Sequence, residues 1–264
     1  MAARFAVLGV GLIGGSIGLA ARRRLGAEVA GWGPRRATVE QALRAGALDH
    51  GADTVAEACE GAEVIFCAGP VGALPELVAE ALAVAGPDAV VTDVGSTKRE
   101  LVASQGGDER FIGGHPLAGA ETAGIGNARA DLFEGARWYL TPTDRSSGLL
   151  YDKLQRTIAG LGARPQAIGA DAHDRLMAAV SHMPHVLANA LVAEAATGLS
   201  EDSEGTAVEV GPSFRDMSRV AGSNPAIWTD IFASNRDAVA DSVESVAARL
   251  SEAAALIRGG DSEA

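Results

Sequence analysis

The sequence predicts an α/β protein in which a domain with a parallel sheet is followed by an all-helical domain. Three observations predict this class. Strand-like apolar segments alternate with helix-like segments over residues 1–169, a glycine-rich turn follows the first strand, and residues 170–264 show helical patterns without a convincing strand. Alternation of strands and helices is typical of a parallel sheet with right-handed crossovers. We therefore expect two domains, residues 1–169 and residues 170–264.

Short apolar segments mark the expected strands of the first domain. They span residues 5–8, 29–32, 64–68, 89–93, 111–112, 138–140 and 165–168. Helical patterns lie between several of them, as at residues 74–84 and 149–161, where apolar residues recur three and four positions apart. In the second domain, helices are expected over residues 171–197, 211–220, 225–232 and 235–257.

Composition and charge restrict the partners. The 264 residues are 47% hydrophobic and 21% charged, which is ample for a buried core. With 22 basic and 34 acidic residues the net charge is −12, which argues against binding to nucleic acid or to anionic membranes. The chain has neither a signal-peptide pattern nor an apolar run long and glycine-free enough to span a bilayer. We expect a cytoplasmic protein without nucleic-acid or membrane partners, whose Cys59 and Cys67 are reduced thiols.

The glycine-rich turn has the spacing G-x-G-x-x-G, formed by Gly9, Gly11 and Gly14. The first glycine permits a tight turn, the second lets the backbone approach a pyrophosphate, and the third allows the helix to pack closely on the strand. The N-terminus of the following helix offers N–H groups and the positive end of a dipole to phosphates. We therefore predict a Rossmann-type dinucleotide site that contains these glycines together with Leu12 and Ile13.

The end of the second strand favours NADP as the cofactor. An acidic residue is expected there when NAD is bound, to hold the ribose 2′-hydroxyl. Gly33 occupies that place, and Arg35 and Arg36 follow closely, where they can hold a 2′-phosphate. A solvated surface pair would give the same sequence, and NAD is the alternative cofactor. Further cofactor contacts are expected from Pro70 and Asp93, which follow or end later strands on the same edge of the sheet.

Four further segments have an unusual composition for loops. They read D-V-G-S-T-K at residues 93–98, G-G-H-P-L-A-G-A-E at 113–121, S-H-M-P-H at 181–185 and F-R-D-M-S-R at 214–219, the last followed by N-P-A-I-W at 224–228. Together with G-L-I-G-G-S in the glycine-rich turn, they resemble the motifs of the prephenate/arogenate dehydrogenase family of tyrosine biosynthesis, in the same order. The resemblance spans residues 9–228, and the four later motifs together are highly specific.

The resemblance implies a Rossmann-type nucleotide-binding domain and a helical dimerisation domain. It implies oxidative decarboxylation of prephenate or arogenate, with hydride transfer to a nicotinamide cofactor. It leaves open whether prephenate, arogenate or a 4-amino ring analogue is the substrate. It also implies that neither a chorismate mutase domain nor a regulatory ligand-binding extension is expected. We expect a two-fold homodimer formed mainly by residues 170–264, because their Ala-rich faces suit close packing of helices between subunits.

The resemblance also assigns catalytic roles. His115 is the candidate base that removes the hydroxyl proton, since histidine titrates near neutral pH. It is expected on a glycine-rich loop at the strand edge. Ser96 matches a family serine that hydrogen-bonds the reacting hydroxyl, the catalytic histidine or the nicotinamide. Its other interpretation is an N-cap for a helix that starts at Thr97. Neither a metal site nor a covalent nucleophile is indicated.

Substrate contacts are expected mainly in the second domain. The resemblance assigns Arg219 to the ring carboxylate, as a bidentate contact. Asp216, three residues earlier on the same helical face, is expected to hold the guanidinium, although an ordinary surface ion pair would show the same spacing. The remaining substrate-binding candidates are His185, Ser181, Glu121 and Arg215.

The other histidines lack such support. His182 is interpreted as structural, and Pro184 beside it is expected to kink the first long helix of the second domain. His50 and His173 have no motif around them and are interpreted as surface residues.

Two other functions fit parts of the pattern. A β-hydroxyacid dehydrogenase has the same domain order, but it needs a catalytic lysine in the first long helix of the second domain. This chain has no lysine after Lys153. A non-catalytic nucleotide-sensing protein would keep the glycine-rich turn, but it has no reason to hold His115, Ser96 and Arg219 together.

Overall fold

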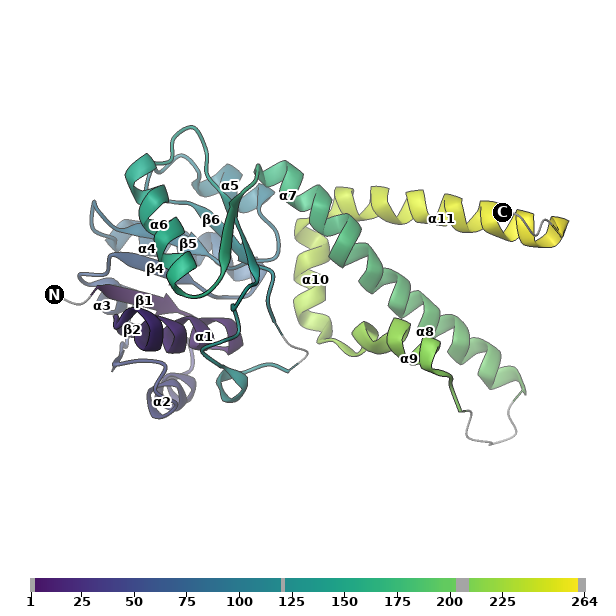
Figure 1. The fold of residues 1–264 in the computed structure, drawn as a ribbon, viewed down its shortest axis with the longest axis horizontal. Helices are drawn as coiled ribbons and strands as arrows, with labels where there is room; N and C mark the ends of the chain where they lie inside the picture. Colours follow the sequence, from purple (N-terminus) through teal and green to yellow (C-terminus); the bar gives the residue numbers. More distant parts are fainter. Residues whose placement is uncertain (1–2, 120–121, 203–208, 261–264) are drawn as a thin grey trace. The chain divides into compact units, whose positions relative to one another are not determined.

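A computed structural model describes residues 3–119, 122–202 and 209–260 (Figure 1). The chain divides into two compact units, residues 1–173 and residues 174–264. The division falls inside helix α7 (Ala170–Met177), a few residues beyond the expected domain boundary.

The first unit is built on a five-stranded parallel sheet with the strand order β3-β2-β1-β4-β5. The strands are β1 (Arg4–Leu8), β2 (Glu28–Trp32), β3 (His50–Gly51), β4 (Val64–Cys67) and β5 (Val90–Asp93). The order reverses between β1 and β4, and open α/β sheets bind their ligands at the carboxyl ends of the strands at such a point. Strand β3 was not predicted from the sequence, because a strand of two residues is too short to show an apolar pattern.

Alternate side chains of each strand enter two separate apolar cores, one on each face of the sheet. In β1, Phe5 and Val7 face one core, while Ala6 and Leu8 face the other. Burial on both faces explains why the strands appear in the sequence as continuous apolar runs. The first core is covered by α1 (Leu12–Ala20), α2 (Arg36–Arg44) and α6 (Gly148–Gly160), and the second by α3 (Val55–Cys59), α4 (Leu74–Val84) and α5 (Arg99–Gln105).

A second sheet has the order β6-β7-β8 and adjoins β5 through a bridge between Val91 and Phe111. Its strands are β6 (Gly113–Pro116), β7 (Arg137–Thr141) and β8 (Arg164–Ala167). β7 runs antiparallel to β6 and parallel to β8, so the expectation of parallel strands throughout was wrong here. In the part of residues 117–136 that is described, the connection contains a 3-10 turn (Ile125–Asn127) and no crossover helix. The chain therefore returns antiparallel to β6.

Strand β6 replaces the strand expected at residues 111–112. A Cβ atom on Gly113 would lie 2.4 Å from Oγ1 of Thr141, and one on Gly114 would lie 2.6 Å from the carbonyl oxygen of Asp93. Glycine is therefore required at both positions for β6 to fit between its neighbours. This composition gives a strand the appearance of a loop. His115 lies on the strand itself, and its placement on a glycine-rich loop was wrong.

The described part of the second unit is helical. The long first helix runs from α7 through a π-helical turn (Ala178–His182) into α8 (Met183–Asp202). It is followed by α9 (Pro212–Ser218), a 3-10 turn (Arg219–Gly222), α10 (Pro225–Ser234) and α11 (Arg236–Gly259). Within this unit, α8 and α11 diverge from a common end at which α10 lies, and α9 lies along α8 (Figure 1).

Pro184 does not break the long helix. Because proline lacks an N–H group and its ring crowds the preceding turn, the helix widens into the π turn directly before it. Over Ala170–Thr197 the helix reaches a mean hydropathy of 1.4, enough by length and composition to cross a membrane. The expectation that no apolar run is long enough was therefore wrong. Core helices of globular proteins pass the same test, so this property alone does not indicate a membrane protein.

Candidate active site

The glycine-rich turn has the geometry of a dinucleotide site. A Cβ atom on Gly9, whose φ is +104°, would lie 2.4 Å from the carbonyl oxygen of Ala68, and one on Gly14 would lie 1.9 Å from that of Gly9. By contrast, a Cβ atom on Gly11 would meet nothing within 4 Å. The space that a pyrophosphate needs is therefore open at the N-terminus of α1, where the first N–H groups lack helical acceptors. The residues present fit a bound dinucleotide.

Three other cofactor candidates surround this turn. Leu12 and Ile13 begin α1 and are half-buried, while Pro70 is exposed after β4, at the start of a 3-10 turn (Val71–Ala73). Because β1 and β4 are paired in parallel, all three lie at the same edge of the sheet. Their contact with the cofactor remains a prediction.

The two arginines after β2 have different surroundings. Arg36 begins α2, and its guanidinium forms ion pairs with Asp53 and, at 3.7 Å, with Glu40. Arg35 is the exposed N-cap residue of that helix. A Cβ atom on Gly33 would make ordinary contacts of 3.6 Å or more, so an acidic side chain would fit there. Arg35 is therefore the better candidate for binding a ligand, while Arg36 is engaged by carboxylates of the protein.

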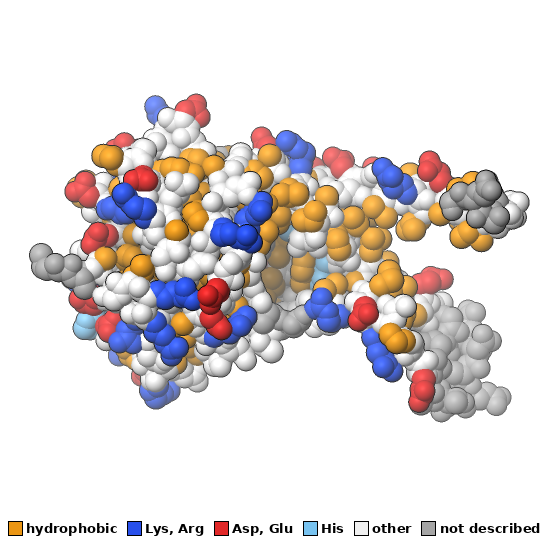
Figure 2. Space-filling view, in the orientation of Figure 1, with side chains coloured by type: hydrophobic (Ala, Val, Ile, Leu, Met, Phe, Trp, Pro, Cys, Tyr) orange, Lys and Arg blue, Asp and Glu red, His pale blue; other side chains and the backbone are white. Residues whose placement is uncertain are grey.

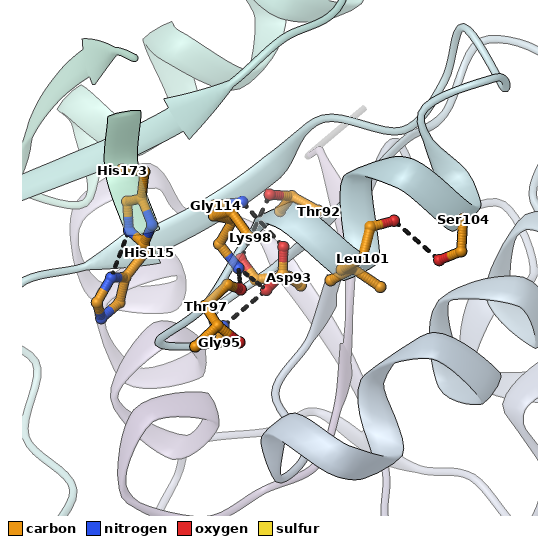
Figure 3. A network of polar contacts seen from close by, with 10 residues as sticks. All are labelled: Thr92, Asp93, Gly95, Thr97, Lys98, Leu101, Ser104, Gly114, His115 and His173. Atoms are coloured by element: carbon orange, nitrogen blue, oxygen red, sulfur yellow. Dashed lines mark hydrogen bonds and ion pairs between the residues drawn. The ribbon is translucent and has the colours of Figure 1, made fainter. Parts of the chain in front are cut away.

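A buried carboxylate organises the carboxyl end of β5 (Figure 3). Asp93 is fully buried, and its Oδ2 accepts a 2.7 Å hydrogen bond from the N–H of Gly95 and forms an ion pair with Lys98. Its Oδ1 accepts a 3.0 Å hydrogen bond from the N–H of Gly114. Lys98 is also fully buried and donates to the carbonyl oxygen of Thr97 at 2.8 Å. Buried charges are tolerated when they are paired and hydrogen-bonded in this way.

Asp93 thus ties the loop that carries Ser96 to the strand that carries His115. Because Asp93 has no exposed surface and its carboxylate already accepts internal donors, the expectation that it contacts the cofactor was wrong. Ser96 is half-buried in the loop. Helix α5 begins at Arg99 with Lys98 as its N-cap residue, so the interpretation of Ser96 as a helix cap was also wrong.

His115 faces a second histidine (Figure 3). Nδ1 of His115 lies 2.9 Å from Nε2 of His173, and the two rings meet edge to face. His173 is fully buried at the start of α7, with its ring 5.7 Å from that of Tyr139, the residue paired with His115 across β6 and β7. The interpretation of His173 as a surface residue was wrong. His50 is exposed, as expected, and lies 3.0 Å from Glu28.

Sequence reasoning missed His173 because no motif surrounds it. The signal that was available is its place in the chain. It follows β8 by a few residues, and β8 pairs with β7, which pairs with β6. Strand pairing through two ladders brings His173 to His115, and such pairing is not encoded in local sequence.

In the second unit, His185 is stacked on Trp228 with 3.7 Å between the ring centroids and 7° between the ring planes. His185 is buried, and this desolvation lowers its pKa. Its Nδ1 atom is buried and has no hydrogen-bond partner among the residues described. His185 is therefore neutral near pH 7 and suited to bind a ligand by a hydrogen bond rather than as a cation.

The neighbouring residues of the same motif have a structural setting. His182 is buried, and its Nδ1 lies 3.2 Å from Nδ2 of Asn235, which also donates to the carbonyl oxygen of Asp174 at 2.8 Å. These bonds connect the π turn to the start of α11, in agreement with the structural role expected for His182. Ser181 is half-buried in that π turn, and π turns occur frequently at functional sites.

The F-R-D-M-S-R segment differs from its expected geometry. Helix α9 ends at Ser218, and Arg219 begins a 3-10 turn. Asp216 and Arg219 therefore do not share an α-helical face. Arg215 and Arg219 are both exposed. Glu121 lies outside the described residues.

Neither cysteine has the surroundings of a reactive thiol. Cys59 and Cys67 are free and buried. Burial raises the pKa of Cys59 to about 12 and that of Cys67 well above its usual value, so both thiols are unreactive. Among the described residues, no three His, Cys, Asp or Glu side chains are grouped so that they could hold a metal ion.

The fold and the glycine-rich turn define the class, a Rossmann-type dinucleotide-binding domain followed by a helical domain. Residues 17–166 match the family model of the prephenate dehydrogenase nucleotide-binding domain, and residues 169–264 match that of the prephenate dehydrogenase dimerization domain. The chain belongs to the prephenate dehydrogenase family, as its motifs indicated.

Similar proteins include prephenate dehydrogenases and an arogenate dehydrogenase. Prephenate dehydrogenase of Bacillus subtilis is 34% identical over 241 residues, which are 88% of this chain and 64% of that protein. The chain thus spans less than two thirds of this relative. Prephenate dehydrogenase from A. aeolicus, in complex with hydroxyphenyl propionate and NAD+, is 29% identical with a TM-score of 0.90, covering 99% of this chain and 93% of that one. Arogenate dehydrogenase from Synechocystis is 28% identical with a TM-score of 0.82, covering 98% and 94%.

Proposed function

We propose that this chain catalyses the oxidative decarboxylation of prephenate or arogenate, with hydride transfer to a nicotinamide dinucleotide. The products are 4-hydroxyphenylpyruvate from prephenate or tyrosine from arogenate. The observation that supports this most strongly is the buried Asp93 carboxylate, which bonds both to the loop of Ser96 and to the strand of His115. A hydroxyl and an imidazole are thereby anchored to one buried group at the edge of the sheet where dinucleotides bind.

In this reaction the protein has two main tasks, to orient the substrate and to remove the hydroxyl proton. A hydride leaves the carbinol carbon, the ring carboxylate leaves as CO₂, and the ring becomes aromatic. A bound nicotinamide dinucleotide supplies the hydride acceptor. His115 takes the hydroxyl proton on Nε2, because its Nδ1 faces His173, and the proton later returns to the phenol oxygen. Ser96 orients the reacting hydroxyl. Aromatisation drives the reaction, so that positioning accounts for most of the protein's contribution.

Substrate binding is proposed for polar residues of the second unit. Arg219 binds the ring carboxylate, as its motif indicates. Because the chain has a net charge of −12, an anionic substrate needs a local positive charge, and Arg219 supplies it in a charge-assisted hydrogen bond. The other parts of the substrate are bound by His185, Ser181 and Arg215. The remaining candidate for substrate binding is Glu121. Prephenate and arogenate differ by a keto or an amino group in the side chain, and relatives of both names resemble this chain.

For the cofactor we propose NADP in preference to NAD. Glycine at position 33 removes the repulsion that an acidic residue would exert on a 2′-phosphate. Arg35 is exposed at the N-terminus of α2, where both its guanidinium and the helix dipole favour an anion. The structure of the A. aeolicus relative holds NAD+, which is the alternative cofactor.

We also propose a homodimer formed through the second unit, which matches a dimerization-domain model. Hydrophobic side chains gather along its helices (Figure 2). Several large ones are exposed, namely Val180, Val192, Met217, Ile227, Leu250, Leu256 and Ile257. A two-fold interface would cover such a surface. Light scattering at micromolar concentration should give the mass of a dimer, and a monomer mass would contradict this assembly.

The activity is tested by supplying NADP or NAD with prephenate, arogenate or a β-hydroxyacid, and following the absorbance of the reduced nicotinamide. The proposal is supported if the dinucleotide is reduced with prephenate or with arogenate and not with a β-hydroxyacid. Reduction only with a β-hydroxyacid would indicate the other dehydrogenase class. Tight binding of the dinucleotide without turnover of any substrate would indicate a nucleotide-sensing protein.

A further inference from the structure

We propose that His173 is a positioning residue for His115. It accepts a hydrogen bond from Nδ1–H of His115, and this bond favours the tautomer in which Nε2 of His115 carries no proton and can act as a base. The inference rests on the proposed role of His115 as the base and adds a residue to that site.

The geometry holds both rings in place. The 2.9 Å between Nδ1 of His115 and Nε2 of His173 is a hydrogen-bond distance. The ring of His173 lies edge-on to Tyr139 with 84° between the ring planes, and its backbone N–H donates to Gly169 at 2.9 Å. The backbone of His115 is paired with Tyr139 in the ladder of β6 and β7. Side chain and backbone are thus both fixed, so the contact follows from the fold.

The chemistry of two imidazoles determines the direction of the bond. A hydrogen bond between these nitrogen atoms requires a proton on one of them and a lone pair on the other. In the proposed reaction His115 accepts the substrate proton on Nε2, so the neutral ring carries its own proton on Nδ1, the atom that faces His173. Nδ1–H of His115 is then the donor, and Nε2 of His173 is the acceptor.

This direction has a consequence for catalysis. With its proton on Nδ1, neutral His115 presents a lone pair on Nε2, which is the form that a base needs. When His115 takes up the hydroxyl proton, the bond from Nδ1–H to His173 becomes charge-assisted and strengthens. An interaction that is stronger after proton transfer than before it lowers the barrier. The arrangement performs the orienting task that a carboxylate performs for histidine in serine proteases.

The test compares two replacements of His173. His173→Phe keeps a ring against Tyr139 and removes the acceptor, while His173→Gln keeps an acceptor in its side-chain amide oxygen. We expect His173→Phe to lower kcat roughly 10- to 100-fold, by analogy with the loss of a partner that orients a metal-binding histidine, with KM for substrate and cofactor nearly unchanged. His173→Gln should restore most of the rate. His50→Phe, at an exposed histidine, is the control and should leave kcat unchanged.

A second measurement does not require activity. Nitrogen-15 NMR of the imidazoles should find His115 of the wild-type chain protonated on Nδ1, and His173→Phe should shift it toward protonation on Nε2. His115 found protonated on Nε2 in the wild type would overturn the inference. An unchanged kcat in His173→Phe would overturn it too, as would equal loss of rate in the Phe and Gln variants. Absence of turnover in a wild type that shows the expected tautomer would instead contradict the proposed function.

Discussion

The amide N–H of Gly114 donates a 3.0 Å hydrogen bond to the buried carboxylate of Asp93. Gly114 directly precedes His115, and Asp93 lies three residues before Ser96 in the loop that follows β5. Because the same carboxylate also accepts from the N–H of Gly95, it fixes the loop and the strand to each other. The position of the proposed base relative to the proposed serine therefore depends on one buried ion pair, Asp93 with Lys98.

Neutralising one member of this ion pair should destabilise the protein. Asp93→Asn removes the carboxylate charge that pairs with the buried Lys98, and we expect a loss of about 3–5 kcal/mol in the free energy of unfolding, measured by urea denaturation. Lys98→Met should cost a similar amount. The double variant Asp93→Asn with Lys98→Met should lose less than the sum, because no charge is then buried alone. Additive losses would show that the two side chains do not stabilise each other.

Removing the guanidinium of Arg219 should weaken substrate binding selectively. We expect Arg219→Ala to cost about 2–5 kcal/mol of substrate affinity, as when one partner of a desolvated charge pair is lost. Cofactor affinity, measured by titration with the dinucleotide alone, should not change. Arg258→Ala, at the end of α11 and outside every motif, serves as the control. Equal weakening of substrate and cofactor would remove Arg219 from the carboxylate site.

Exchanging the residues after β2 should change the choice of cofactor. A charged hydrogen bond contributes about 1.5–3 kcal/mol, which corresponds to roughly a ten- to hundredfold preference for NADP in kcat/KM. Gly33→Asp combined with Arg35→Ala should reverse it, because the new carboxylate binds the ribose hydroxyls and repels a 2′-phosphate. Arg36→Ala should have a smaller effect, since Arg36 already pairs with Asp53 and Glu40. Wild-type preference for NAD, or an unchanged preference in the double variant, would refute the assignment.

Burial of His185 should make the stability of the fold depend on pH. At pH values above the ordinary pKa of 6.5, His185 is neutral in both the folded and the unfolded chain. As the pH falls below that value, the unfolded chain takes up a proton that the folded chain binds only at its lowered pKa. The free energy of unfolding must therefore decrease through this window. Urea denaturation should show a shallower decrease for His185→Phe and an unchanged one for His50→Phe. Identical pH profiles for wild type and His185→Phe would contradict the prediction.

Much of the fold could be predicted from local sequence. Neighbouring residues such as Val7 and Leu8 are buried on opposite faces of the sheet, and this burial gives short apolar runs that identify strands without knowledge of their neighbours. The glycine-rich turn was also predictable, because its three glycines lie close together in the sequence, although the contact that requires Gly9 is with Ala68 after β4. The antiparallel β6 was not predictable, since Gly113 and Gly114 are required by contacts with Thr141 and Asp93 rather than by their own backbone.

The residues of the candidate site that lie in sequence motifs could be predicted. Those that reach the site only through tertiary packing could not. His115 and Ser96 lie in motifs, whereas His173 reaches His115 only through strand pairing. Asp93 lies in a motif too, but its position at a strand end suggested a ligand contact. Only the structure reveals that Lys98 and two backbone N–H groups already occupy its carboxylate. A local sequence pattern does not distinguish a buried carboxylate that organises a site from an exposed one that binds a ligand.

The most direct test of the central claim is the turnover of prephenate and of arogenate by the wild-type chain and by His115→Asn, with the reduced cofactor and the released CO₂ counted together. We predict that the wild type reduces one dinucleotide for each CO₂ released from at least one of the two substrates. His115→Asn should lower kcat by about 10²–10⁴-fold, as expected for the loss of a general base, with little change in KM. Near-normal kcat in His115→Asn, or no turnover of either substrate by the wild type, would contradict the account.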